Sequence, residues 1–187
     1  MSDGTTGSSR PTWGTIADAA ASDPWPTATL APGARIRALG AGLPGVVVEE
    51  RVLDAPYERV WAFIADLERS VPTFDRLVAR VRVTSGDGAR LRAHTRSTWR
   101  LAGAALSFDV DLEPGWCWMV SRPRLYVVGM AAEPVPDDPG RTRYLHLEGV
   151  PFGGRVLGPV ARATRLRHRR HVAADVDGIE RAVRERR

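Results

Sequence analysis

The spacing of apolar residues changes twice along the chain, and each change predicts a change of secondary structure. A β-branched run at 46–53, VVVEERVL, predicts a strand. Apolar residues then recur at every third or fourth position through 53–69, LDAPYERVWAFIADLER, which predicts an amphipathic helix. Pro56 suits its first turn, where a missing N–H leaves no helical hydrogen bond unmade. The next segment, SVPTFDRL, predicts a second short helix. The expected buried stripe consists of Val60, Phe63, Ile64 and Leu67, with Trp61 beside it.

From residue 78 to residue 150 the period falls to two. Six further strands are predicted, separated by turns such as GDG and PDDPG: VARVRVTS, RLRAHTRSTW, LSFDVDL, CWMVS, RLYVVGMAAEPV and RTRYLHLEGV. Regular alternation with Arg and Asp on the second face predicts an antiparallel sheet with one solvated face. Counting the first valine-rich run, the sheet has seven strands.

The last segment, 155–187, predicts a long helix. Its apolar stripe advances in steps of four, three and four residues through Val172, Val176, Ile179 and Val183. Projected backwards, the same face carries His168 and Thr164. The expected order is therefore one strand, two short helices, six strands and one long helix, an α+β arrangement.

Residues 1–44 form a separate, low-pattern extension, rich in Gly, Ser, Thr, Ala and Pro and expected to be partly disordered. The folded domain is expected over 45–187. The glycines of GAGLPG at 40–45 resemble a dinucleotide-binding fingerprint, but that fingerprint follows a strand and opens a helix, whereas this stretch precedes a strand. It is interpreted as a turn.

Composition narrows the class of protein. The chain has one cysteine, Cys117, so an internal disulfide and a cysteine-based metal cage are excluded. It shows neither an apolar run of membrane-spanning length nor a secretory signal pattern, and a cytoplasmic location is expected. All 27 basic residues are Arg, and the positive charge gathers in residues 155–187, with 10 Arg against 4 acids.

The stretch VLDAPYERVWAFIADLERSVPTF closely resembles the opening of START-like proteins of the Bet v 1 and polyketide cyclase (SRPBCC) superfamily. Those proteins begin with a valine-rich strand, a short residue followed by proline, and a Val-Trp helix ending in Asp. The resemblance extends over residues 46–187 in element order. It implies a helix-grip fold, in which a seven-stranded curved antiparallel sheet wraps around the long C-terminal helix, with a hydrophobic cavity between them. Residues 45–187 would then be a START-like ligand-binding domain.

Small residues on the predicted inner faces support such a cavity, since a fully packed interior would favour larger side chains there. The alternative is that Trp99, Phe108 and Met119 fill the space. Strand register leaves open whether Trp116 and Trp118 or Cys117 and Met119 face inward. The predicted ligand-binding residues are Ala93, Thr95, Ser97, Trp99, Phe108, Val110, Met119, Gly129, Leu145, Leu147 and Thr164.

Candidate chemistry is sparse. The four histidines form no metal-ligand spacing, and neither HExxH nor CxxC occurs, so no metal and no cofactor are predicted. His168 on the inner helix face and Arg143 on the last strand are weak candidates for catalysis, one to move a proton and one to hold an oxyanion. The alternatives are a histidine at the stripe margin and an arginine extending to water. Tyr144, His146 and Glu148 have the opposite strand phase and are expected on the outer face.

The superfamily includes lipid carriers, hormone receptors, aromatase/cyclases and chaperone cofactors, so the resemblance does not determine a function. The leading expectation is binding of a hydrophobic small molecule, such as a lipid, an isoprenoid or a polyketide-like compound. A polyketide cyclase or dehydratase is the alternative. A third possibility is an acidic partner, RNA on a ribosome or anionic lipid, held by the basic helix. The basic run of this helix extends from Arg162 to His171 and contains five Arg and two His. A solvated helix face is the commoner interpretation of such a run, which makes nucleic acid a less favoured partner.

Overall fold

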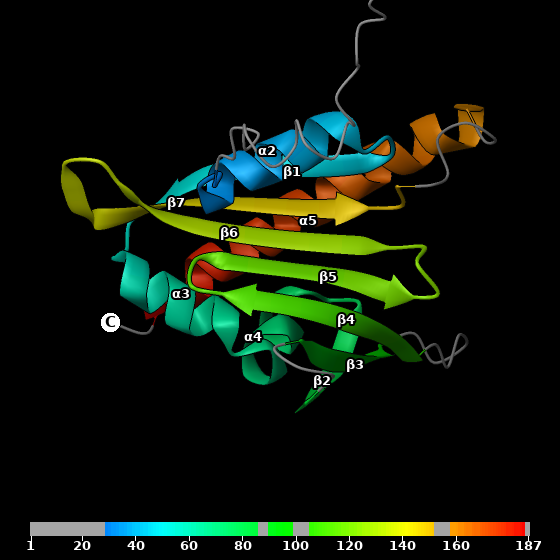
Figure 1. Cartoon of the computed structure of the whole chain (residues 1–187), viewed down its shortest axis with the longest axis horizontal. Coiled ribbons are helices and arrows are strands. Elements are labelled where there is room, and N and C mark those ends of the chain that lie inside the picture. Colours follow the sequence, from blue (N-terminus) through cyan, green and yellow to red (C-terminus); the bar gives the residue numbers. More distant parts are fainter. Residues whose placement is uncertain (1–28, 86–89, 99–104, 152–157, 186–187) are drawn as a thin grey trace, which may run out of the picture.

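The structure is a computed structural model that describes residues 29–85, 90–98, 105–151 and 158–185, with the backbone alone over 158–165. One antiparallel sheet lies between two layers of helix, with α5 on one face and α2 on the other (Figure 1). The elements in chain order are α2 (Pro32–Gly42), β1 (Val46–Leu53), α3 (Tyr57–Ala65), α4 (Leu67–Phe74), β2 (Val78–Ser85), β3 (Leu91–Ser97), β4 (Ala105–Glu113), β5 (Trp116–Arg122), β6 (Val127–Val135), β7 (Asp138–Gly149) and α5 (Gly158–Glu185).

The seven strands of this sheet are ordered β1-β7-β6-β5-β4-β3-β2. Strands β2 to β7 follow one another as hairpins, and β1 joins the far edge by pairing with β7, from Val46 opposite Gly149 to Leu53 opposite Thr142. The chain crosses between the two edges through α3 and α4, which lie at one end of the sheet (Figure 1). The predicted α+β helix-grip fold is confirmed.

The concave face of the sheet holds the larger core. Val176, Ile179 and Val183 of the predicted α5 stripe are buried there together with Val60, Phe63 and Ile64 of α3. Burying one such side chain contributes about 1.5–3 kcal/mol. Helices α4 and α5 approach closely at Gly178, where a Cβ would lie 2.9 Å from Cβ of Phe74. A larger residue at this position would push the two helices apart.

The convex face is covered in part by α2, which differs from the expectation of a fully solvated outer face. Ile36 of α2 is completely buried against Val127, Ala131, Leu145 and Leu147 of β6 and β7. The first turn of α2 is held by Glu133, whose Oε1 accepts a hydrogen bond from the Gly33 N–H at 2.7 Å. A carboxylate at a helix N-terminus is favourable, because the free N–H groups there carry partial positive charge.

Candidate functional site

A cavity of about 540 Å³ lies between the concave face of the sheet, the end of α4 and the middle of α5. Its walls are largely apolar, formed by Phe74, Phe108, Met119, Val128 and Met130 among others. Its rim is apolar as well. Leu77, Leu106, Leu125 and Val150 all line the cavity, yet they are 52%, 39%, 58% and 38% exposed. The volume falls in the range of sites that enclose a small organic molecule, and the exposed rim provides an apolar entrance.

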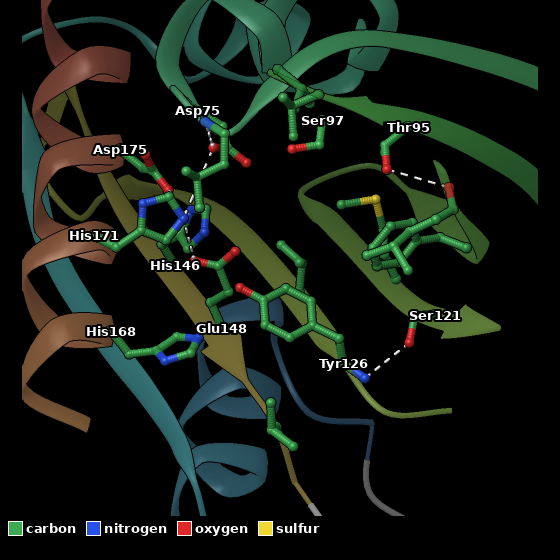
Figure 2. A pocket seen from close by; sticks show the side chains of 18 of the residues that line it. Asp75, Thr95, Ser97, Ser121, Tyr126, His146, Glu148, His168, His171 and Asp175 are labelled. Atoms are coloured by element: carbon green, nitrogen blue, oxygen red, sulfur yellow. Dashed lines mark hydrogen bonds and ion pairs between the residues drawn. The ribbon is translucent and has the colours of Figure 1, made fainter. Parts of the chain in front are cut away.

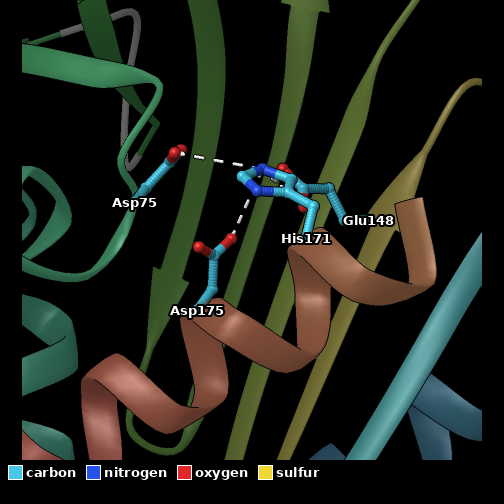
Figure 3. A group of neighbouring side chains, drawn as sticks. All are labelled: Asp75, Glu148, His171 and Asp175. Atoms are coloured by element: carbon cyan, nitrogen blue, oxygen red, sulfur yellow. Dashed lines mark ion pairs between the residues drawn. The ribbon is translucent and has the colours of Figure 1, made fainter. Parts of the chain in front are cut away.

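One end of the cavity is polar. Here α4, β7 and α5 bring three carboxylates around one imidazole (Figures 2 and 3). The Nε2 of His171 lies 3.4 Å from Asp175 Oδ2, 3.5 Å from Glu148 Oε2 and 3.9 Å from Asp75 Oδ1. Asp175 and Glu148 are almost completely buried, whereas Asp75 and His171 retain partial exposure towards the cavity. We call these four residues the carboxylate–imidazole cluster.

Each member of the cluster is positioned by its own element. Asp75 terminates α4, where its N–H donates to the carbonyl of Val71 at 2.9 Å and its side chain accepts from the N–H of Leu77 at 2.8 Å. His171 and Asp175 are four residues apart on α5, so both project from the same helix face. Glu148 stands near the end of β7, on the strand face that looks towards α5.

Tyr126 and His168 lie beside the cluster. The Tyr126 hydroxyl points towards Glu148 (Figure 2), and the Tyr126 ring centroid is 6.0 Å from that of His168. The turn that leads into Tyr126 is held by Ser121, whose Oγ accepts hydrogen bonds from the N–H groups of Leu125 at 3.2 Å and Tyr126 at 2.9 Å. The polar end therefore includes a phenol and a second imidazole, both facing the cavity (Figure 2).

Burial dominates the electrostatics of this end. It raises the pKa of Glu148 to about 8 and the pKa of Asp175 to about 9, and neighbouring carboxylates add to both shifts. Burial also raises the pKa of Asp75 and lowers the pKa of His171. All four shifts favour the uncharged forms, because burial penalises the charged form of each group. These four side chains can donate hydrogen bonds to an oxygen atom of a molecule in the cavity, or accept them from its hydroxyl group. They could also surround a cation.

His146 lies on the same face of β7, deeper in the protein. Its Nδ1 is 2.8 Å from the Tyr144 hydroxyl, and burial lowers the pKa of this imidazole to about 3. It is therefore neutral at ordinary pH. Its Nε2 is buried and makes no hydrogen bond within the described part of the chain.

The predicted lining residues divide by strand face. Thr95, Ser97, Phe108, Met119 and the catalytic candidate His168 all line the cavity. Ala93 and Val110 are buried in the concave core without being part of the cavity wall. Trp99 lies outside the described residues, and so does the side chain of Thr164, although its backbone belongs to α5. Cys117 and Met119 face the concave core, whereas Trp116 and Trp118 belong to the cluster under α2.

The predicted orientation of β7 and β6 is wrong. Leu145 and Leu147 pack on the convex face beneath α2, and Gly129 faces Ile36 rather than the cavity. His146 and Glu148, expected outside, line the cavity. The reason is that α2 buries the convex face. The apolar residues of β7 therefore do not mark the side that faces the cavity. The ionisable residues on the opposite face of the strand are the ones that the cavity encloses.

Arg143 consequently does not meet His168. Its side chain lies on the convex face of β7, where Nε is 3.5 Å from Glu50 Oε1. The same carboxylate oxygen also forms an ion pair with Arg37 of α2. The hypothesis that Arg143 holds an oxyanion while His168 moves a proton in the same cavity is therefore wrong, because Arg143 lies on the other face of the sheet.

Sequence reasoning missed Asp75, Tyr126, Glu148, His171 and Asp175. One signal was present: His171 and Asp175 are four residues apart and flank the buried valines of α5, which places both at the margin of an apolar stripe. The partners from α4 and β7 have no such signal, because only the fold brings them to α5.

The basic run of α5 is exposed where its side chains are described, at Arg167, Arg169 and Arg170. A salt-sensitive partner for this surface remains a prediction. None of the helices in the described part of the chain has an apolar stretch long enough to cross a bilayer.

No protein-family model matches the chain. No curated protein sequence matches it either. Solved structures do. A protein of Thermus thermophilus is 20% identical, with a TM-score of 0.55 over 74% of this chain and 96% of that one. The Zhui aromatase/cyclase of a Streptomyces species is 19% identical, with a TM-score of 0.55 over 75% of this chain and 94% of that one.

A third similar structure is an AHSA1-like protein of Aeromonas hydrophila. It is 15% identical, with a TM-score of 0.51 over 75% of this chain and 92% of that one. At these identities the likeness is one of fold. The chain has the START-like, helix-grip fold that polyketide aromatase/cyclases and AHSA1-like proteins share.

Proposed function

We propose that the protein binds an apolar small molecule in the cavity between the sheet and α5. The observation that carries this proposal is the combination of an enclosed apolar wall with an exposed apolar rim at Leu77, Leu106, Leu125 and Val150. Exposed apolar side chains are unfavourable in water unless something covers them, and here they surround the entrance of the cavity.

The polar end narrows the chemical class of the ligand. A pure hydrocarbon would leave the groups of Glu148, Tyr126 and His171 facing an apolar surface, which costs free energy for each unpaired polar group. A molecule with an apolar body and a carbonyl or hydroxyl oxygen at one end would satisfy both ends of the cavity. Isoprenoid and polyketide-like compounds belong to this class, and the aromatase/cyclase similarity agrees with it.

The test is to block the cavity from β3. Ser97 lines the cavity, whereas its neighbour Arg96 is exposed and is not part of the cavity wall. Ser97→Phe should weaken binding of an apolar fluorescent probe at least about tenfold, equivalent to ~1.4 kcal/mol. Arg96→Phe adds the same aromatic group outside the cavity and should leave the affinity unchanged. Circular dichroism and urea titration establish that both variants fold. Equal affinities in folded Ser97→Phe and the unsubstituted protein would contradict the proposal.

Catalysis on the bound molecule is the second candidate function. The observation that favours it is that His168 and Tyr126, an imidazole and a phenol, face the cavity side by side next to the cluster. Proton transfer between such groups and a bound carbonyl compound is the usual basis of cyclisation and dehydration.

His168→Ala separates the two functions. A binding protein should lose at most about tenfold in affinity, the worth of one ordinary hydrogen bond. An enzyme should lose product formation about a hundredfold with unchanged binding. Native mass spectrometry of the protein purified from its own host would supply the molecule needed for both measurements.

A further inference from the structure

We infer that Asp75, Glu148, His171 and Asp175 form a binding site for one divalent transition-metal ion at the polar end of the cavity (Figure 3). Each residue offers one ligand atom, and the four atoms all lie within 4.8 Å of one another. The ligand set is one imidazole nitrogen and three carboxylate oxygens, contributed by α4, β7 and α5.

The spacing of these atoms matches a small coordination sphere. Two bonds of about 2.1 Å at a tetrahedral angle place ligand atoms about 3.4 Å apart. His171 Nε2 lies 3.4 Å from Asp175 Oδ2 and 3.5 Å from Glu148 Oε2. The separation from Asp75 Oδ1, at 3.9 Å, must close on binding. Asp75 ends a short helix and is the most exposed of the three acids, so this adjustment is the easiest one available.

A second observation, independent of the clustering, points to a ligand. Glu148 is only 4% exposed, and its Oε2 makes no hydrogen bond within the described residues. This is the oxygen that faces His171 Nε2. A buried polar atom without a hydrogen bond is uncommon, and a position for an ion is one of its ordinary explanations. The hydroxyl of Tyr126 points towards the Glu148 carboxyl group from the cavity side (Figure 2), where it could help to orient this metal ligand.

Charge compensation also favours a cation. Among the described residues, the three acids lie within ion-pair distance of His171 and of no arginine, although the charge of Arg76 acts on Asp175 from a distance. Burying several carboxylates without matched positive charge is costly. A divalent ion would supply the missing charge at the point where their oxygens converge.

The ligand types select the kind of ion. Imidazole suits Zn²⁺, Fe²⁺ and related ions, and carboxylates suit Mn²⁺ as well, whereas Mg²⁺ and Ca²⁺ prefer oxygen alone. The absence of a histidine-rich spacing in the sequence therefore does not argue against this site, because only one histidine is used. His146 is not one of the four residues whose ligand atoms lie within 4.8 Å of one another.

The site opens towards the cavity, because all four residues line it. If the cavity holds the oxygen-bearing molecule proposed above, that oxygen can complete the coordination sphere. This last step rests on the proposed function, whereas binding of the ion does not.

The experiment uses the full-length protein without a histidine tag, stripped with a chelator and titrated with Zn²⁺ by calorimetry in the absence of any apolar probe. One ion per chain is expected. Glu148→Gln and His171→Ala should each weaken binding at least about tenfold. Asp177→Asn is the matched control, because Asp177 lies two residues from Asp175 on α5 but is exposed and pairs with Arg51. It should bind Zn²⁺ as the unsubstituted protein does.

Unfolding temperature provides a measurement that needs no variant. Zn²⁺ bound only to the folded state should raise the melting temperature, and Mg²⁺ at the same concentration should not. A folded protein that takes up no Zn²⁺, or one whose Zn²⁺ affinity is the same in folded Glu148→Gln and His171→Ala, would overturn the inference. Probe binding measured with chelator present tests the proposed function separately, so the two can fail independently.

Discussion

Ile36 of α2 lies directly over Gly129 of β6, so closely that a Cβ on Gly129 would come within 2.7 Å of Ile36 Cδ1. The same Cβ would lie 3.0 Å from two ring carbons of Trp118. Gly129 is therefore small because a helix packs on it, and not because it lines a cavity. This relationship shows which face of β6 is outward, and by pairing it shows the same for β7.

Gly129→Ala should destabilise the fold without affecting the cavity. Fitting the methyl group requires Ile36 or Trp118 to move, and overpacking of this kind costs about 1–3 kcal/mol. Urea titration measures the loss, and binding of the apolar probe should be unchanged. Gly42→Ala is the control, because a Cβ there meets nothing within 4 Å. Weaker probe binding in folded Gly129→Ala would contradict the assigned strand face.

Ile36→Ala should cost about 2–5 kcal/mol of unfolding free energy, the range for removing most of a large buried aliphatic side chain. The measurement tests whether α2 is an integral cover of the convex face. A loss below about 0.5 kcal/mol, the size of an ordinary surface effect, would mean that α2 contributes little to stability.

Ile64→Ala in α3 should also cost about 2–5 kcal/mol, because Ile64 is fully buried at the end of the sheet. Arg59→Ala, on the exposed face of the same helix, should stay within about 0.5 kcal/mol. Chemical denaturation of both variants gives the comparison. Equal losses would show that α3 is not packed as described.

Cys117 should resist thiol reagents while the protein is folded. The side chain is completely buried, and burial raises the pKa of the thiol to about 12, so the reactive thiolate is scarce near pH 8. In the unfolded chain the thiol pKa returns to about 8.5 and labelling becomes fast. The rate of labelling with a chromogenic disulfide, measured with and without urea, checks this. Rapid labelling without denaturant would contradict the burial of β5.

The element order could be predicted from the sequence, and so could much of the concave core. Each strand and helix follows from the spacing of its apolar residues, and this spacing can be seen in consecutive residues of the sequence. The stripe from Val172 to Val183 and the burial of Ile64 follow from helical spacing alone. Thr95 and Ser97 of β3 and Phe108 of β4 line the cavity on the strand face that alternation indicates, because no residue of those strands belongs to the cluster under α2. For β5, which is apolar on both faces, the sequence left the inward face open, and the structure places Met119 there.

Only the tertiary structure decided which face of β6 and β7 encloses the cavity. Alternation distinguishes two faces but does not name the inner one, and α2, whose single large buried side chain is Ile36, gives little periodic signal of its own. The carboxylate–imidazole cluster could likewise not be predicted from the sequence. Asp75, Glu148 and His171 are far apart along the chain, and their approach depends on β7 pairing beside β1 and on α5 packing across that strand. Local pattern determined the elements, and long-range packing determined the site.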